Sequence, residues 1–171
     1  QKLLRLILQK KIMIDAEILV ETKYWEKIIK NPKKKILSLL NKFPNQYKFN
    51  KKKVSISVLL TNNKKVKVLN KNFRKKNKPT DILSFPSFNK IDFKKNIKKN
   101  NIYLGDIAIS YQEFFKNNKN DLENGFIKIF IHGYLHLLNF NHKSNKDYAL
   151  MSSVENKVFQ IVKGKIDNKN I

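Results

Sequence analysis

Cysteine is absent from the 171-residue sequence, so disulfide bonds, thiolate nucleophiles and cysteine-ligated zinc or iron–sulfur sites are excluded. Long apolar runs are absent too, since no stretch approaches the roughly 20 apolar residues that a membrane-spanning helix needs. Acidic residues are few: 13 Asp and Glu stand against 37 Lys and Arg, which gives a formal net charge of +24. These absences predict a cytoplasmic protein whose ligands are acidic.

Arginine is almost absent as well, because 35 of the 37 basic residues are Lys and only Arg5 and Arg74 are Arg. The chain also contains 23 Asn, and a joint excess of Lys and Asn is typical of an AT-rich genome. Codon bias therefore explains the surface lysine as readily as selection for polyanion binding does. With either origin, such a surface attracts phosphate backbones, so the charge permits nucleic-acid binding without establishing it.

Hydrophobic residues make up 41% of the chain, which is enough for a core, and the length is typical of one domain. Met13 is a natural start, so we expect residues 1–12 to form an unstructured extension and residues 13–171 to form a single domain. Apolar alternation or β-branched runs predict strands at residues 14–20, 54–58, 82–85 and 102–109. Strands mixed with helices predict a layered α/β or α+β fold.

Helical spacing predicts four helices, at residues 24–40 with a break at Asn31-Pro32, 66–76, 122–138 and 146–163. A fifth helix is expected after a capping box formed by Ser110 and Glu113. Gly164 is the expected C-terminal stop of the last helix. Residues 87–101 are mostly Lys, Asn and Ser, and we expect them to form a mobile surface loop.

All three histidines lie within eleven residues, in the run His-Gly-Tyr-Leu-His-Leu-Leu-Asn-Phe-Asn-His. His132 and His136 are four residues apart on a predicted helix, so their imidazoles project from one face. His142 joins them only if the helix ends, and Asn139 stands where a left-handed C-cap residue belongs. Three neutral imidazoles that converge would bind zinc and leave a fourth position open for water, as in catalytic sites.

Two other interpretations of the histidines stay open. One or more of them could cap the helix or form hydrogen bonds in the core, or the ion could stabilise the fold without catalysis. The helix is similar to that of zinc metallopeptidases, whose glutamate beside the first histidine is the general base. Gly133 occupies that position here, which argues against ordinary zinc proteolysis.

Arg74 stands out in a chain that otherwise uses lysine. A guanidinium binds phosphate through two parallel hydrogen bonds and stays charged, which an ammonium group cannot match. Arg74 is therefore a candidate for phosphate binding, although the survival of two arginines by chance explains it equally well.

Four segments together resemble the YbeY family of bacterial single-strand endoribonucleases, in order over residues 13–164. They are Asn72-Phe73-Arg74, the run from Asn77 to Pro86 (Asn-Lys-Pro-Thr-Asp-Ile-Leu-Ser-Phe-Pro), Leu104-Gly105-Asp106-Ile107 and the histidine run. The resemblance implies an α+β, zincin-like domain with a small mixed β-sheet flanked by helices. It also implies one zinc ion bound by His132, His136 and His142, with Arg74 as a catalytic residue in the same cleft.

Three positions depart from the family pattern. Asn139 replaces a usual glycine, which a left-handed cap tolerates. Asn141 replaces a usual aspartate before the third histidine, so any role of a carboxylate there in orienting a ligand is lost. Lys75 replaces a customary glycine after the arginine, which could alter that loop.

The resemblance implies a zinc-dependent endoribonuclease that acts on single-stranded RNA in the cytoplasm. The implied substrate is ribosomal RNA, especially the three-prime end of the small-subunit RNA, with a role in ribosome quality control and contact with the small ribosomal subunit. The alternative is a non-catalytic, ribosome-associated assembly factor with a structural zinc site. Asp106 and Glu155 are weak candidates for a general base, and each is more consistent with a structural role.

Overall fold

The computed structural model describes residues 14–49 and 52–168, so the extension expected at residues 1–12 lies outside the described residues. The strands are β1 (Asp15–Val20), β2 (Lys53–Thr61), β3 (Ile82–Pro86) and β4 (Asn101–Ser110). The helices are α2 (Tyr24–Ile28), α3 (Pro32–Lys42), α4 (Asn63–Arg74), α5 (Lys90–Asn96), α6 (Tyr111–Asn118), α7 (Leu122–Leu137) and α8 (Asn145–Asp167), and a 3₁₀ turn spans Asn45–Tyr47. No helix within the described ranges is long and apolar enough to span a bilayer.

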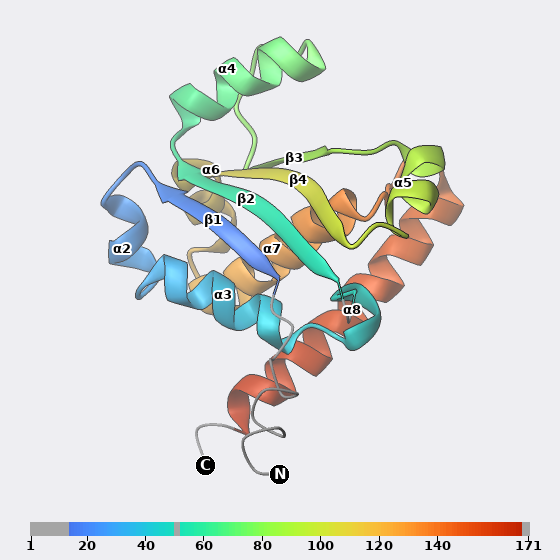
Figure 1. The fold of residues 1–171 in the computed structure, drawn as a ribbon. Helices are drawn as coiled ribbons and strands as arrows, with labels where there is room; N and C mark the ends of the chain where they lie inside the picture. Colours follow the sequence, from blue (N-terminus) through green and yellow to red (C-terminus); the bar gives the residue numbers. More distant parts are fainter. Residues whose placement is uncertain (1–13, 50–51, 169–171) are drawn as a thin grey trace.

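The strands form one mixed sheet in the order β1-β2-β4-β3. β1, β2 and β4 are parallel, whereas β3 runs antiparallel to β4 and forms one edge. Helix α4 lies over one face of the sheet, and α7 crosses the other face with α3 and α8 beside it (Figure 1). This arrangement confirms the expected fold class, a small mixed sheet flanked by helices in one domain.

Helix α7 is the central element of the larger core, with apolar side chains buried on most of its circumference. Phe126, Phe130 and Tyr134 are fully buried in this core, and Phe43 at the end of α3 packs against the last two. A smaller core lies under α4 on the opposite face, where Val66 contacts residues of β3 and β4. Because α7 is enclosed in this way, side chains at its C-terminal end are held in place by the whole domain.

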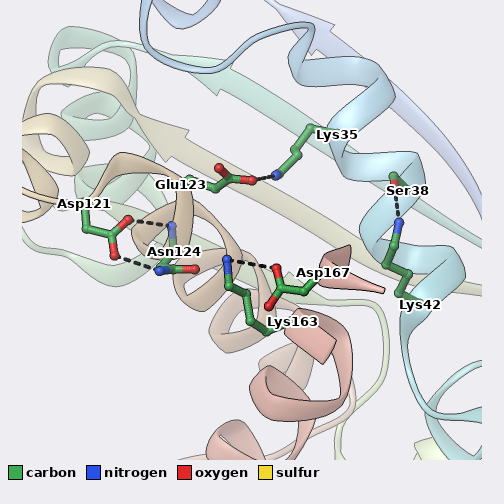
Figure 2. A network of polar contacts seen from close by, with 8 residues as sticks. All are labelled: Lys35, Ser38, Lys42, Asp121, Glu123, Asn124, Lys163 and Asp167. Carbon is green, nitrogen blue, oxygen red and sulfur yellow. Dashed lines mark hydrogen bonds and ion pairs between the residues drawn. The ribbon is translucent and has the colours of Figure 1, made fainter. Parts of the chain in front are cut away.

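Helix starts follow the sequence closely. Asn31 and Pro32 are the N-cap and first residue of α3, as predicted, and the Asn31 side chain accepts a hydrogen bond from the backbone N–H of Lys34 at 3.1 Å. Asp121 caps α7 by accepting hydrogen bonds from the backbone and side chain of Asn124 (Figure 2). The same view shows the ion pair between Lys35 of α3 and Glu123 of α7, with a distance of 2.5 Å.

The mobile loop predicted at residues 87–101 is wrong, because helix α5 occupies the middle of this segment. Asn89 caps the helix by accepting hydrogen bonds from the backbone N–H groups of Ile91 and Asp92. Phe93 anchors the helix, with its ring 6.2 Å from the ring of Phe49. The apolar residues of this segment are few, but one aromatic contact and a good cap suffice to order a short helix.

The predicted capping box at the start of α6 is also wrong. The Ser110 side chain makes no capping hydrogen bond, and its hydroxyl instead donates to the side-chain oxygen of Asn63. The Glu113 carboxylate accepts a hydrogen bond from the side-chain nitrogen of Asn63 at 3.0 Å. Both groups are therefore used to join α6 to the start of α4, a contact between segments distant in sequence.

Gly164 does not stop α8, which continues to Asp167. Val162 is fully buried and Ile166 packs against the core, so apolar contacts on both sides of the glycine carry the helix through it. Ile161 is 43% exposed, whereas its neighbour Val162 faces the core.

Gly105 permits a bulge in β4, and we expect its substitution to have a large effect on stability. Its φ is +132°, and a Cβ there would lie 2.1 Å from the backbone oxygen of Phe85 on the neighbouring strand. We expect Gly105→Ala to lower the free energy of unfolding by about 3 kcal/mol or more, through backbone strain and overpacking. Gly164→Ala is the matched control, since nothing lies within 4 Å of that position, and it should stabilise α8 by up to about 1 kcal/mol. Urea unfolding checks both values, and equal effects would contradict the strain at Gly105.

Candidate metal centre

The end of α7 determines where the third histidine lies. Leu138 is the C-cap, and Asn139 is left-handed with φ +66°, as predicted for this position. The backbone N–H of Asn139 donates to the oxygen of His136 at 2.9 Å, and that of Phe140 donates to the oxygen of Leu135 at 3.0 Å. These two bonds are a Schellman motif, which ends the helix and turns the chain back.

The turn brings the three histidines together. One ring nitrogen from each of His132, His136 and His142 lies within 4.8 Å of the others. The ring centroids are 4.6 Å apart for His132 and His136, 5.6 Å for His132 and His142, and 5.1 Å for His136 and His142. His132 and His136 are partly buried, whereas His142 is exposed. The cluster is therefore open on the side of His142.

The Nδ1 atoms of the two helical histidines are both engaged. Nδ1 of His132 lies 2.5 Å from a carboxylate oxygen of Glu155 on α8. Nδ1 of His136 lies 2.9 Å from the backbone oxygen of Phe140 in the turn. A carboxylate and a carbonyl only accept hydrogen bonds, so both Nδ1 atoms are the donors in these contacts. In the neutral rings, both Nε2 atoms consequently carry lone pairs.

These two Nε2 atoms face each other at a distance of 3.0 Å. Two lone pairs this close repel unless a proton or a metal cation lies between them. Nitrogen ligands around a tetrahedral zinc ion are about 3.3 Å apart, as zinc–nitrogen bonds of about 2.0–2.1 Å require. The donor set and its spacing thus suit a metal ion, and the three-histidine cluster could hold one.

The protonation of His136 also suits a ligand. Burial is the largest of the causes that together lower the pKa of His136 from 6.5 to about 4; the neighbouring His132, His142 and Arg74 act in the same direction, and the hydrogen bond to Phe140 acts against them. The imidazole is therefore neutral at physiological pH, which is the form that binds metal.

Gly133 lies on the side of α7 that faces the sheet. A Cβ there would lie 2.5 Å from Cδ1 of Ile82, 3.2 Å from the hydroxyl oxygen of Ser84 and 3.3 Å from Ile107. The Ser84 hydroxyl donates to the backbone oxygen of Gly133 at 3.1 Å, which joins α7 to the edge strand β3. The position taken by glutamate in metallopeptidases is therefore a packing contact here and leaves no room for a carboxylate.

Arg74 is the last residue of α4 and points back to the same edge strand. Its Nη2 donates to the backbone oxygen of Ser84 at 3.2 Å, and its charge is one of the causes, after burial, that lower the pKa of His136. Lys75, which follows it, is left-handed with φ +60° and is the C-cap of α4. The lysine at this position thus adopts the backbone conformation that a glycine would favour, and the helix still ends at Arg74.

Asp106 and Glu155, the two carboxylates considered as general bases, lie in different parts of the structure. Asp106 accepts a hydrogen bond from the hydroxyl of Tyr103 at 2.6 Å and is exposed on the α4 side of β4, away from the histidines. Glu155 contacts His132 directly, and sequence reasoning missed this partnership. A signal was present, because Glu155 is four residues after Met151 and three before Val158, both buried, which places it on the inward face of α8.

Comparisons with known proteins bear on the family of the chain. The family model described as endoribonuclease YbeY matches residues 18–163. An endoribonuclease YbeY from Pelagibacter ubique is 47% identical over 158 residues, which cover 90% of this chain and 99% of that protein. One from Buchnera aphidicola is 39% identical over 82% of this chain and 88% of that protein. A solution structure of a Thermotoga maritima protein covers 90% of this chain and 93% of that chain, at 23% identity and a TM-score of 0.49.

The family model spans most of the domain, and the first of these relatives is matched over nearly its whole length. The expected resemblance over residues 13–164 is confirmed within a few residues at each end. The chain therefore belongs to the endoribonuclease YbeY family of RNA-cleaving hydrolases.

Proposed function

We propose that the protein is a zinc-dependent endoribonuclease specific for single-stranded RNA. The observation that carries the proposal is the pair of Nε2 atoms at 3.0 Å, each with its Nδ1 engaged elsewhere and with His142 beside them. The chain has a net charge of +24, and a cation bound at this site would add to it. Both favour a substrate that is anionic, as RNA is.

His132, His136 and His142 would hold the zinc ion, and the open side at His142 would admit the substrate. When bound, zinc supplies Lewis acidity toward a phosphoryl oxygen and lowers the pKa of water to about 7. Glu155 holds His132 by its Nδ1, so that Nε2 faces the centre of the cluster. This contact makes Glu155 an orienting group for the histidine.

Arg74 would bind the scissile phosphate and stabilise the negative charge that develops on it. Its guanidinium makes one hydrogen bond to the edge strand, which leaves further N–H donors for phosphate oxygens. The lysine-rich surface would hold the RNA backbone without reading the base sequence.

The physiological substrate in this proposal is ribosomal RNA in the cytoplasm, with the three-prime end of the small-subunit RNA as the site of maturation. The small ribosomal subunit is the corresponding partner, and quality control of ribosomes is the corresponding cellular role. The support is membership in the family together with the phosphate-attracting charge of the chain.

Cleavage assays with and without chelator test the proposal. Purified protein should cut a labelled single-stranded RNA, lose this activity in EDTA and regain it when zinc is added, while a duplex of the same sequence stays intact. A His136→Ala preparation controls for contaminating ribonuclease and should be inactive. Binding of RNA without cleavage would instead support the non-catalytic assembly factor with a structural zinc ion.

A further inference from the structure

A cavity of about 300 Å³ lies beside the histidine cluster, between α5, the turn that ends α7 and the first turns of α8. Its apolar walls include Phe93 of α5, Phe140 of the turn and Leu150 of α8. The volume is at the lower end of the range for pockets that take small ligands. The side chains of these residues take no part in the candidate metal centre. The turn that ends α7 is what links the cavity to that centre.

The turn connects this cavity to the candidate metal centre. Phe140 lines the cavity with its side chain, and its backbone oxygen accepts the hydrogen bond from Nδ1 of His136. Asn141 also lines the cavity and directly precedes His142. A molecule in the cavity would consequently lie against the turn that contacts His136 and leads into His142, two of the residues that would hold the metal ion.

Positive charge is placed at the mouth of the cavity. Lys90 and Lys94 are exposed, line the cavity and are four residues apart, so they project from the same face of α5. Neither forms an ion pair with any residue that the structure describes. The carboxylate in the lining, Asp147, accepts a hydrogen bond from the hydroxyl of Ser144 at 2.8 Å at the start of α8.

A hydrogen-bond donor in the lining lacks an acceptor. The side-chain nitrogen of Asn139 is buried and has no hydrogen-bond partner within the described residues. Buried donors are normally paired, so a rotation of this amide toward the cavity would let it donate to an acceptor brought by a ligand. Carbonyl oxygens and ring nitrogens on the edges of nucleobases are such acceptors.

We infer that this cavity binds one unstacked nucleobase of the RNA strand, next to the site of cleavage. The base would contact the rings of Phe93 and Phe140, accept a hydrogen bond from Asn139 and place its flanking phosphates near Lys90 and Lys94. Aromatic rings, amides and adjacent lysines are the groups with which proteins bind single-stranded RNA. The inference rests on the proposed function, and it explains a preference for single strands because a paired base cannot enter.

Binding measurements on the full-length protein test this inference separately from cleavage. Binding is measured by fluorescence anisotropy at constant salt, in EDTA so that the strand stays intact. Circular dichroism verifies that each variant is folded. Two probes of equal length and charge are compared, a single-stranded RNA and its abasic counterpart. The unsubstituted protein should bind the RNA about tenfold more tightly than the abasic strand, as stacking of one base provides.

Variants test the lysine pair and the Asn139 amide separately. Lys90→Gln with Lys94→Gln should weaken RNA binding several-fold more than Lys116→Gln with Lys119→Gln, which removes equal charge at the other end of α7. Asn139→Gly keeps the left-handed turn and removes the amide, so the preference for RNA over the abasic strand should fall several-fold. The inference is overturned if either difference is missing. Failure of the proposed function would appear instead as chelator-insensitive or absent cleavage, with these binding results unchanged.

Discussion

Replacing Arg74 with alanine is expected to lower the rate of RNA cleavage by about 10²–10³-fold, as loss of a single group that stabilises transition-state charge does. Zinc content and melting temperature should stay nearly unchanged, because the side chain is exposed and makes one hydrogen bond to Ser84. Single-turnover rates at saturating protein, together with metal analysis of the same sample, measure both properties.

Two variants control for charge alone. Arg74→Lys keeps the positive charge but loses the planar pair of donors, so its cleavage rate should lie between those of the alanine variant and the unsubstituted protein. Lys71→Ala removes one charge from the same helix and should have little effect on single-turnover cleavage. If Lys71→Ala and Arg74→Ala reduced the rate equally, Arg74 would act only as part of the basic surface.

Replacing His136 with alanine is expected to lower the zinc content from about one ion per chain to nearly none, and to abolish cleavage. The substitution removes one of three converging nitrogens and the bond from Nδ1 to the oxygen of Phe140. Two remaining imidazoles do not provide the three protein ligands that catalytic zinc sites have. Metal analysis by mass spectrometry measures the occupancy, and retention of a full equivalent of zinc would contradict the assignment of this ligand.

Glu155→Ala gives a graded form of the same experiment, since it keeps all three histidines. Loss of a carboxylate behind a metal-binding histidine typically weakens metal affinity by about 10–100-fold. Glu155→Gln, which can still accept a hydrogen bond from His132, should have a smaller effect. Competition with a chromophoric chelator measures the affinities, and an unchanged affinity in the alanine variant would show that the 2.5 Å contact has no part in metal binding.

The parts of the fold that the sequence predicts well are those decided by neighbouring residues. The break at Asn31-Pro32, the alternation along β2 and the left-handed Asn139 all depend on local backbone preferences, and the structure has each of them. Ser110 and Gly164 show the limit of this reasoning. Their local signals are overridden by contacts with Asn63 and by apolar contacts on either side of the glycine.

The candidate site also has some features that the sequence predicts and others that it does not. The convergence of His132, His136 and His142 is local enough to predict, because a helical spacing and one cap residue place all three. The contacts of Glu155 with His132 and of Arg74 with Ser84 depend on how α8 and α4 pack against the rest of the domain. A single sequence indicates which of these residues are unusual, but only tertiary packing decides which atoms they meet.

The edge strand β3 has a consequence for self-association. Strands at the edge of a sheet can pair with another copy of the chain and start aggregation. Here the strand is five residues long, ends at Pro86, which has no N–H to donate, and has the oxygen of Ser84 occupied by Arg74. Arg74, the residue proposed to bind phosphate, thus also occupies a backbone acceptor that intermolecular strand pairing would use.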